Sequence, residues 1–170
     1  MSRYSELAAK VDGFFARVAA RHGQDMACGT GCSDCCAVRL TVTAVEGEAI
    51  RDLIGELPAD GRGRLAANVA AAPADRCAAL DAAGRCLIYA ARPIVCRSHG
   101  APIKMRRGSL PVVEACHRNF TRGGPAAADA DCILDQTTLS ALVLTVDRAE
   151  GGDGTRVDLA ELLRDSVRDA

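Results

Sequence analysis

The sequence has few aromatic residues, no tryptophan and no long apolar run. Aromatics make up 3% of the 170 residues, and the formal net charge is −1. No stretch approaches the roughly 18 apolar residues of a membrane-spanning helix, and the charged N-terminus lacks the apolar segment of a signal peptide. The balanced charge gives no basic surface for nucleic acid. We therefore expect a cytoplasmic protein that binds neither nucleic acid nor membrane, and the sequence leaves any protein partner unknown.

Aliphatic residues supply the hydrophobic core, because aromatic residues are few. Hydrophobic residues make up 49% of the chain, which is long enough to bury one core. Apolar residues recur at helical spacing in five segments. We predict helices over 5–21, from a capping box at Thr43 and Glu46 to Pro58, in the alanine-rich stretch before Pro73, over 135–149, and from Thr155 onward.

These elements predict a mainly α fold, a small helical domain with short strands and a cysteine-rich metal-binding core. Short strands are expected at 37–42 and just before Cys116. We expect one domain over residues 1–170, with the cysteine-cluster core at 28–116 and helical extensions at 1–23 and 133–170.

Cysteine is abundant, with nine residues in all and four of them in "CGTGCSDCC" at 28–36. An odd number excludes complete internal pairing. Cys35 and Cys36 are adjacent, and disulfides ordinarily need a Cα separation of about 4.4–6.8 Å. In a reducing compartment, dense thiols are more often ligands than disulfides, and thiolate suits zinc and iron–sulfur centres.

The spacing excludes several familiar sites. It has neither the two separated C-x2-C knuckles of a zinc ribbon nor the bacterial ferredoxin run. Cys28, Cys32 and Cys35 resemble the C-x3-C-x2-C triad with which radical S-adenosylmethionine enzymes hold a 4Fe–4S cluster. That family uses a partial α/β barrel larger than this chain, and no strand–helix alternation is present here.

A closer resemblance extends over residues 28 to 116. After the first cluster come Cys77 and "CLIYAARPIVCR" from residue 86, then a single cysteine at 116. This pattern is similar to the bacterial CxxCxxCC, or YkgJ-like, family of zinc- or iron-chelating domains. The resemblance implies zinc or iron as cofactor, the iron in the form of a 4Fe–4S cluster in one alternative. It implies eight metal ligands: Cys28, Cys32, Cys35, Cys36, Cys77, Cys86, Cys96 and Cys116.

Eight thiolates suit two four-coordinate sites, or one cluster with a separate zinc. Their negative charge needs compensation, and we expect Arg92 or Arg97 to provide it. His99 and His117 are alternative ligands, because zinc sites with three cysteines and one histidine are common. Tyr89 is expected to pack. Two residues fall outside the expected set: Cys132, an extra cysteine, and His22, which the helix dipole explains.

The sequence therefore predicts a cytosolic metal-binding protein whose metal is at least structural. Structural zinc contributes about 10–16 kcal/mol in small domains, as much as the net stability of about 5–15 kcal/mol of most proteins. Two alternatives stay open. One is a metal-dependent enzyme of protein modification such as methyl transfer, since the domain resembles the cysteine-rich part of bacterial flagellin lysine N-methylases. The other is a metal-handling protein.

Overall fold

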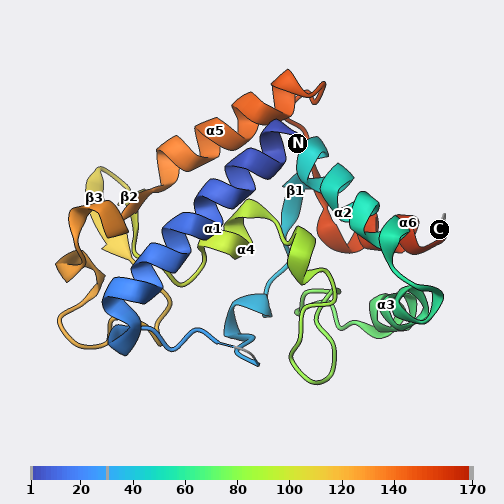
Figure 1. Ribbon diagram of the computed structural model, residues 1–170, viewed down its shortest axis with the longest axis horizontal. Helices are drawn as coiled ribbons and strands as arrows, with labels where there is room; N and C mark the ends of the chain where they lie inside the picture. Colours follow the sequence, from blue (N-terminus) through green and yellow to red (C-terminus); the bar gives the residue numbers. More distant parts are fainter. Residues whose placement is uncertain (1, 30, 169–170) are drawn as a thin grey trace. The chain divides into compact units, whose positions relative to one another are not determined.

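A computed structural model describes residues 2–29 and 31–168 and confirms the mainly α fold (Figure 1). Six α-helices are present among these residues: α1 Arg3–His22, α2 Ala44–Glu56, α3 Ala59–Ala71, α4 Ile94–Ser98, α5 Gln136–Ala149 and α6 Leu159–Arg168. The strands are short: β1 Thr41–Thr43, β2 Ile103–Arg107, β3 Leu110–Glu114, β4 Leu134–Asp135 and β5 Arg156–Asp158. None of the described helices is both long and apolar enough to cross a membrane.

The chain forms two compact units, each built from two stretches of sequence. Unit 1 comprises Met1–Gly29 and Ile94–Val146, and unit 2 comprises Thr30–Pro93 and Asp147–Ala170. Each unit has its own apolar cluster. The expected single domain over 1–170 stays a prediction.

Unit 2 is a helical core closed by a two-stranded ribbon. β1 pairs antiparallel with β5, with Val42 opposite Val157. The predicted capping box starts α2, where Glu46 Oε2 accepts a 3.0 Å hydrogen bond from the Thr43 N–H. Helices α2, α3 and α6 bury an aliphatic cluster that includes Ile50, Ile54, Leu65, Val69, Leu159, Leu162 and Leu163. Because these side chains pack without aromatic rings, the low aromatic content is compatible with a real core.

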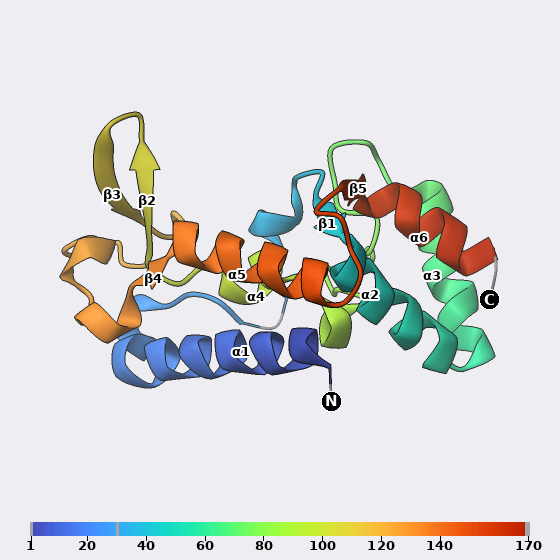
Figure 2. The ribbon, with the colours of Figure 1, turned by 90° about the horizontal axis from the view of Figure 1, so that it is seen from above.

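Unit 1 is built on α1 and a small sheet. Ser2 caps α1, its Oγ accepting a 3.1 Å hydrogen bond from the Ser5 N–H. Helix α4 packs on α1, and the sheet order is β3-β2-β4, with β2 antiparallel to β3 and parallel to β4. Figure 2 shows the β2–β3 hairpin standing away from the helices of the unit. Phe14 and Val18 of α1 lie in a cluster with Phe120 and Cys132.

Several elements differ from the sequence prediction. The strand expected at 37–42 is only Thr41–Thr43, and residues 156–158, expected in the last helix, form β5. The five residues of α4 add a sixth helix, and they are too few to give a periodic apolar pattern. The strand expected before Cys116 is half of a hairpin, which turns at Gly108 with a φ of 62°. β2 was missed because its sequence, "IKMRR", places charged residues where a buried strand would carry apolar ones.

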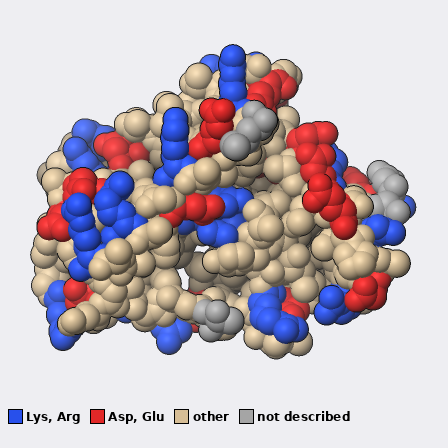
Figure 3. Space-filling view, viewed as in Figure 1, with Lys and Arg blue, Asp and Glu red and all other residues tan. Residues whose placement is uncertain are grey.

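Charged side chains are spread rather than gathered by sign. On the face in Figure 3, lysines and arginines alternate with acidic residues. Several form ion pairs, among them Arg39 with Asp158 at 2.8 Å and Arg97 with Asp12 at 2.5 Å. Opposite charges are therefore mixed on this face, and several of them are paired locally.

Candidate metal centre

Cys35 and Cys36 lie in a short 3-10 turn, Asp34–Cys36, after a loop that passes through Gly31. Gly31 has a φ of 87°, a conformation that only glycine adopts at low cost. The Cys36 N–H donates to the Ser33 carbonyl at 2.9 Å and closes the turn.

The sulfur atoms of Cys35 and Cys36 are 4.0 Å apart. In a tetrahedral four-thiolate site with metal–sulfur bonds of about 2.3 Å, neighbouring sulfurs lie about 3.8 Å apart. The pair is thus spaced as two ligands of one metal.

A second cysteine loop is tied to the first. The Cys77 N–H donates to the Cys36 carbonyl at 2.8 Å. Leu80 pairs with Cys86 in an isolated antiparallel bridge, which brings the two ends of this loop together. Asn68 of α3 donates to the carbonyls of Ala78 at 2.7 Å and of Leu80 at 3.1 Å. Both cysteine loops are therefore fixed by backbone and amide hydrogen bonds within unit 2.

Backbone N–H groups also face the sulfurs of the second loop. Burial raises the pKa of the Cys77 thiol, while a hydrogen bond from the Ala79 N–H acts in the opposite direction. Burial likewise raises the pKa of Cys86, opposed by the Ile88 N–H. Donors two residues after a cysteine favour its thiolate, and burial disfavours it. Without a cation these thiols keep their protons at neutral pH, and a metal ion would supply the missing positive charge.

Cys35 and Cys36 titrate as a pair. The hydrogen bond from the Cys36 thiol lowers the pKa of Cys35 to about 6, because it stabilises the Cys35 thiolate. The same contact and burial raise the pKa of Cys36 above that of an ordinary thiol. One thiolate is therefore available near neutral pH in this exposed turn.

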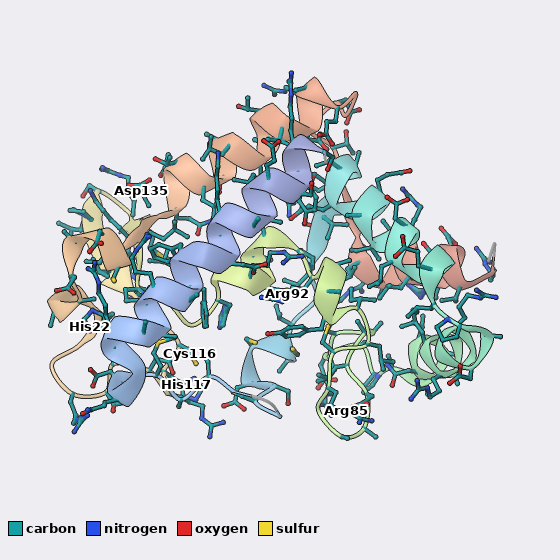
Figure 4. The ribbon with its side chains drawn as sticks, viewed as in Figure 1. His22, Arg85, Arg92, Cys116, His117 and Asp135 are labelled. Carbon is teal, nitrogen blue, oxygen red and sulfur yellow. The ribbon has the colours of Figure 1, made fainter. Side chains whose placement is uncertain are left out.

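The two arginines expected to balance thiolate charge belong to different units. Arg92, labelled in Figure 4, lies in unit 2, where its charge acts to lower the pKa of Cys86. Its guanidinium also stacks over Tyr89, 4.1 Å from the ring centroid. Tyr89 is 64% exposed, so the packing expected of it takes the form of this surface contact with Arg92. Arg97 lies in unit 1, buried, where it pairs with Asp12.

In unit 1, one buried amide organises the surroundings of two cysteines. Asn119 Nδ2 donates to Cys28 Sγ at 3.1 Å and to the Gly100 carbonyl at 2.7 Å, and its Oδ1 accepts from the Ala27 N–H at 2.7 Å. Its own N–H donates to the Cys116 carbonyl at 2.8 Å. A Cβ on Gly100, whose φ is 99°, would lie 2.6 Å from Cys28 Sγ. Glycine is needed there because the sulfur occupies the space.

The third predicted cysteine of unit 1, Cys96, lies on α4 and is half-buried. His99 follows that helix, and His117, labelled in Figure 4, follows Cys116; both residues are exposed. No metal-binding group found among the described residues includes either imidazole, so the role of His99 and His117 as ligands stays a prediction.

The eight predicted ligands divide between the units. Unit 2 holds Cys32, Cys35, Cys36, Cys77 and Cys86, and unit 1 holds Cys28, Cys96 and Cys116. Among the residues that the structure describes, no three of these sulfurs within one unit lie mutually within 4.8 Å. Metal ligation by the eight cysteines thus stays a prediction, although five thiols in two linked loops are a donor set that fits zinc or an iron–sulfur cluster.

Sequence reasoning missed Asn68 and Asn119. Both are single polar residues whose hydrogen-bond partners lie elsewhere along the chain. Asn119 comes three residues after a predicted ligand, which is the one signal that could have found it.

The helices and the thiol-bearing loops together define a mainly α protein with clustered cysteines. The model of the CxxCxxCC family, described as "Putative zinc- or iron-chelating domain", matches residues 27–117, more than half of the chain. The chain belongs to this family, and the resemblance read from its motifs is confirmed. Comparisons with curated proteins and with solved structures found no match.

Proposed function

We propose that this protein binds zinc or iron through its eight cysteines in the cytoplasm, and that the metal stabilises the fold. The observation that carries the proposal is the joining of two cysteine loops in unit 2. The sulfurs of Cys35 and Cys36 are 4.0 Å apart, and the Cys77 N–H donates a backbone hydrogen bond to the Cys36 carbonyl. We assign Cys35, Cys36, Cys77 and Cys86 to one centre, with the other four cysteines as the remaining ligands.

The chemistry of the loops supports a structural role. A bound zinc ion would cross-link the loops, and an iron–sulfur cluster would add the capacity to carry an electron. Four thiolates around a divalent ion leave an excess of negative charge. Arg92 and the N–H groups of Ala79 and Ile88 offset part of it, as partners outside the ligand sphere do in other metal sites.

Metal content tests this function. Protein purified without oxygen is analysed for metals and sulfide and by its absorption spectrum. Zinc in a colourless sample supports a structural or zinc-handling protein, and iron with sulfide and a broad visible band supports a cluster. Cys36→Ser should lose the metal of the unit 2 centre, and Ala37→Ser, a change of similar size at the exposed next residue, should keep it. Metal-free protein with nine reactive thiols would contradict the proposal.

One observation favours metal delivery as a second function. Cys35 is exposed and has a lowered pKa, so an accessible thiolate is present for ligand exchange with a partner. Delivery requires a metal that leaves within the time of an encounter. Competition with a chelator of known affinity distinguishes the two: slow, incomplete removal indicates a closed structural centre, and rapid removal indicates delivery.

A further inference from the structure

Three potential metal ligands meet in unit 1, away from the predicted cysteine ligands. They are His22 at the end of α1, Asp129, and Cys132 in the 3-10 turn Ala130–Cys132. One ligand atom from each lies within 4.8 Å of both others. Figure 4 shows His22 where α1 ends. All three residues lie outside the family-matched segment 27–117, so the family assignment says nothing about this group.

The His22 ring presents a lone pair to Asp129. The Asp129 N–H donates to His22 Nε2 at 3.4 Å, which makes this nitrogen an acceptor. The Asp129 carboxylate atom Oδ2 lies 3.5 Å from the same nitrogen. A metal ion bound here would take the Nε2 lone pair in place of the Asp129 N–H, with the carboxylate oxygen as its neighbouring ligand. With metal bonds of about 2.0–2.2 Å, nitrogen and oxygen ligands on one tetrahedral zinc lie about 3.4 Å apart.

We propose that His22, Asp129 and Cys132 form a second metal site, selective for Zn²⁺. Thiolate, imidazole and carboxylate are the three donors that zinc uses, whereas calcium and magnesium prefer oxygen alone. One thiolate and one carboxylate neutralise the divalent charge, so the complex adds no net charge to the partly buried site. Three protein ligands leave a fourth position for water.

The surroundings hold the three ligands in place. The His22 ring packs against Phe120, with centroids 5.6 Å apart, and the Cys132 side chain is fully buried. Arg21 reaches Asp129 Oδ2 at 3.5 Å and Asp131 Oδ1 at 2.6 Å, which ties the turn to α1. Burial of Cys132 disfavours a role as an exposed nucleophile. The carboxylate is the accessible ligand, since the Asp129 side chain is 57% exposed, and it gives a metal ion a path of entry.

A direct test uses the full-length protein loaded with ¹¹³Cd²⁺, a spin-active substitute for zinc, and labelled with ¹⁵N-histidine. The chain has three histidines, so His22→Gln assigns the ring signals. We expect a one-bond ¹¹³Cd–¹⁵N coupling at His22 Nε2, together with a cadmium resonance distinct from that of four-thiolate sites. Absence of any coupling at His22 would overturn the proposal. Because wild-type protein gives this result, a variant that fails to fold does not affect it.

Zinc counting gives the matched comparison. Asp129→Asn should lose one zinc per chain, or bind it at least about tenfold more weakly, since even outer-shell partners contribute about 10–100-fold. Asp131→Asn, a neighbouring exposed carboxylate that pairs with the same arginine, should keep it. Equal zinc in both variants argues against the site. Cys36→Ser removes metal from the unit 2 centre alone, so the failure of one proposal is distinguishable from failure of the other.

Discussion

The backbone N–H of Cys77 lies 2.8 Å from the carbonyl oxygen of Cys36 and joins the two cysteine loops of unit 2. This bond involves no side chain, so it does not use the thiols that a metal would bind. It holds the two loops side by side, which keeps their cysteines close together. Four predictions follow, one on the residue that positions the second loop and three on packing and hydrogen bonds elsewhere in the two units.

Asn68 positions the Cys77 loop through its two hydrogen bonds to the carbonyls of Ala78 and Leu80. Asn68→Ala should cost about 1–3 kcal/mol of stability, at about 1 kcal/mol per lost bond plus unpaired carbonyls. Metal affinity should fall by about 10–100-fold. Chemical denaturation and chelator competition measure the two effects. Arg64→Ala, at an exposed position of the same helix, is the control and should change neither. Unchanged affinity in Asn68→Ala would mean that the loop holds its shape without the amide.

Asn119 positions the segments around Cys28 in unit 1, where its side chain makes three hydrogen bonds. Asn119→Ala should destabilise the protein by about 2–4 kcal/mol, because it is buried and leaves an N–H and a carbonyl without partners. Urea denaturation of the variant measures the loss. Asn119→Asp keeps the acceptor for the Ala27 N–H but removes the donor to Cys28 and Gly100. Its buried carboxylate would face the Gly100 carbonyl oxygen without a cation, so it should lose at least as much stability as Asn119→Ala, and a clearly smaller loss would contradict the assigned donor bonds.

Two glycines of α2 should respond to alanine in opposite directions. A Cβ on Gly47 would lie 2.6 Å from the Leu162 side chain of α6, whereas a Cβ on Gly55 would meet nothing within 4 Å. Gly55→Ala should stabilise the protein by about 0.5–1 kcal/mol, the usual helix gain over glycine. Gly47→Ala should destabilise it by about 1–3 kcal/mol, the range for overpacking. Thermal unfolding of the pair tests the close approach of α2 to α6, and a stabilised Gly47→Ala would contradict it.

Acid should remove the contribution of Asp158. Burial raises the pKa of this carboxyl, but hydrogen bonds from Arg39 and from the N–H groups of Ala160 and Glu161 outweigh it and leave the pKa below its ordinary value. A depressed carboxyl pKa stabilises the fold above the unfolded value of about 3.9 and loses that effect as pH falls through the folded value.

Asp158→Asn keeps an acceptor for the helix N–H groups but removes the negative charge that pairs with Arg39, so it should destabilise the protein by up to about 1 kcal/mol at pH 7 and by much less near pH 2. Denaturation at a series of pH values measures the convergence. Asp165→Asn, an exposed position on the same helix, serves as the control. A difference between wild type and Asp158→Asn that stays constant down to pH 2 would contradict the assignment.

The sequence was sufficient for the long helices, and the reasons are local. The capping box at Thr43 and the apolar stripes of α1, α2 and α6 each lie within one segment. Helix α4 and strand β2 were not predicted because their residues are too few or too polar to show a period. The motif likewise predicted a glycine-containing loop around the first cysteines, and Gly31 lies in it.

Other parts of the candidate sites depend on contacts between distant segments. Asn119 reaches Cys28 across most of the unit 1 sequence, and His22 meets Cys132 in the same way. A single polar residue has no periodicity, and helix-dipole reasoning accounted for His22 without a partner. Such residues become visible only when the fold brings them together.

The family motif and the folding unit have different limits. A polypeptide cut at residues 27 and 117 would keep all eight cysteines of the motif. It would lack β5, the pairing partner of β1, and the leucines of α6 that fill the unit 2 core. It would also lack Asn119 and all of α5. The matched segment is therefore smaller than the folding unit. Inserted into another protein, it would carry the thiols without the helices and strand that orient them.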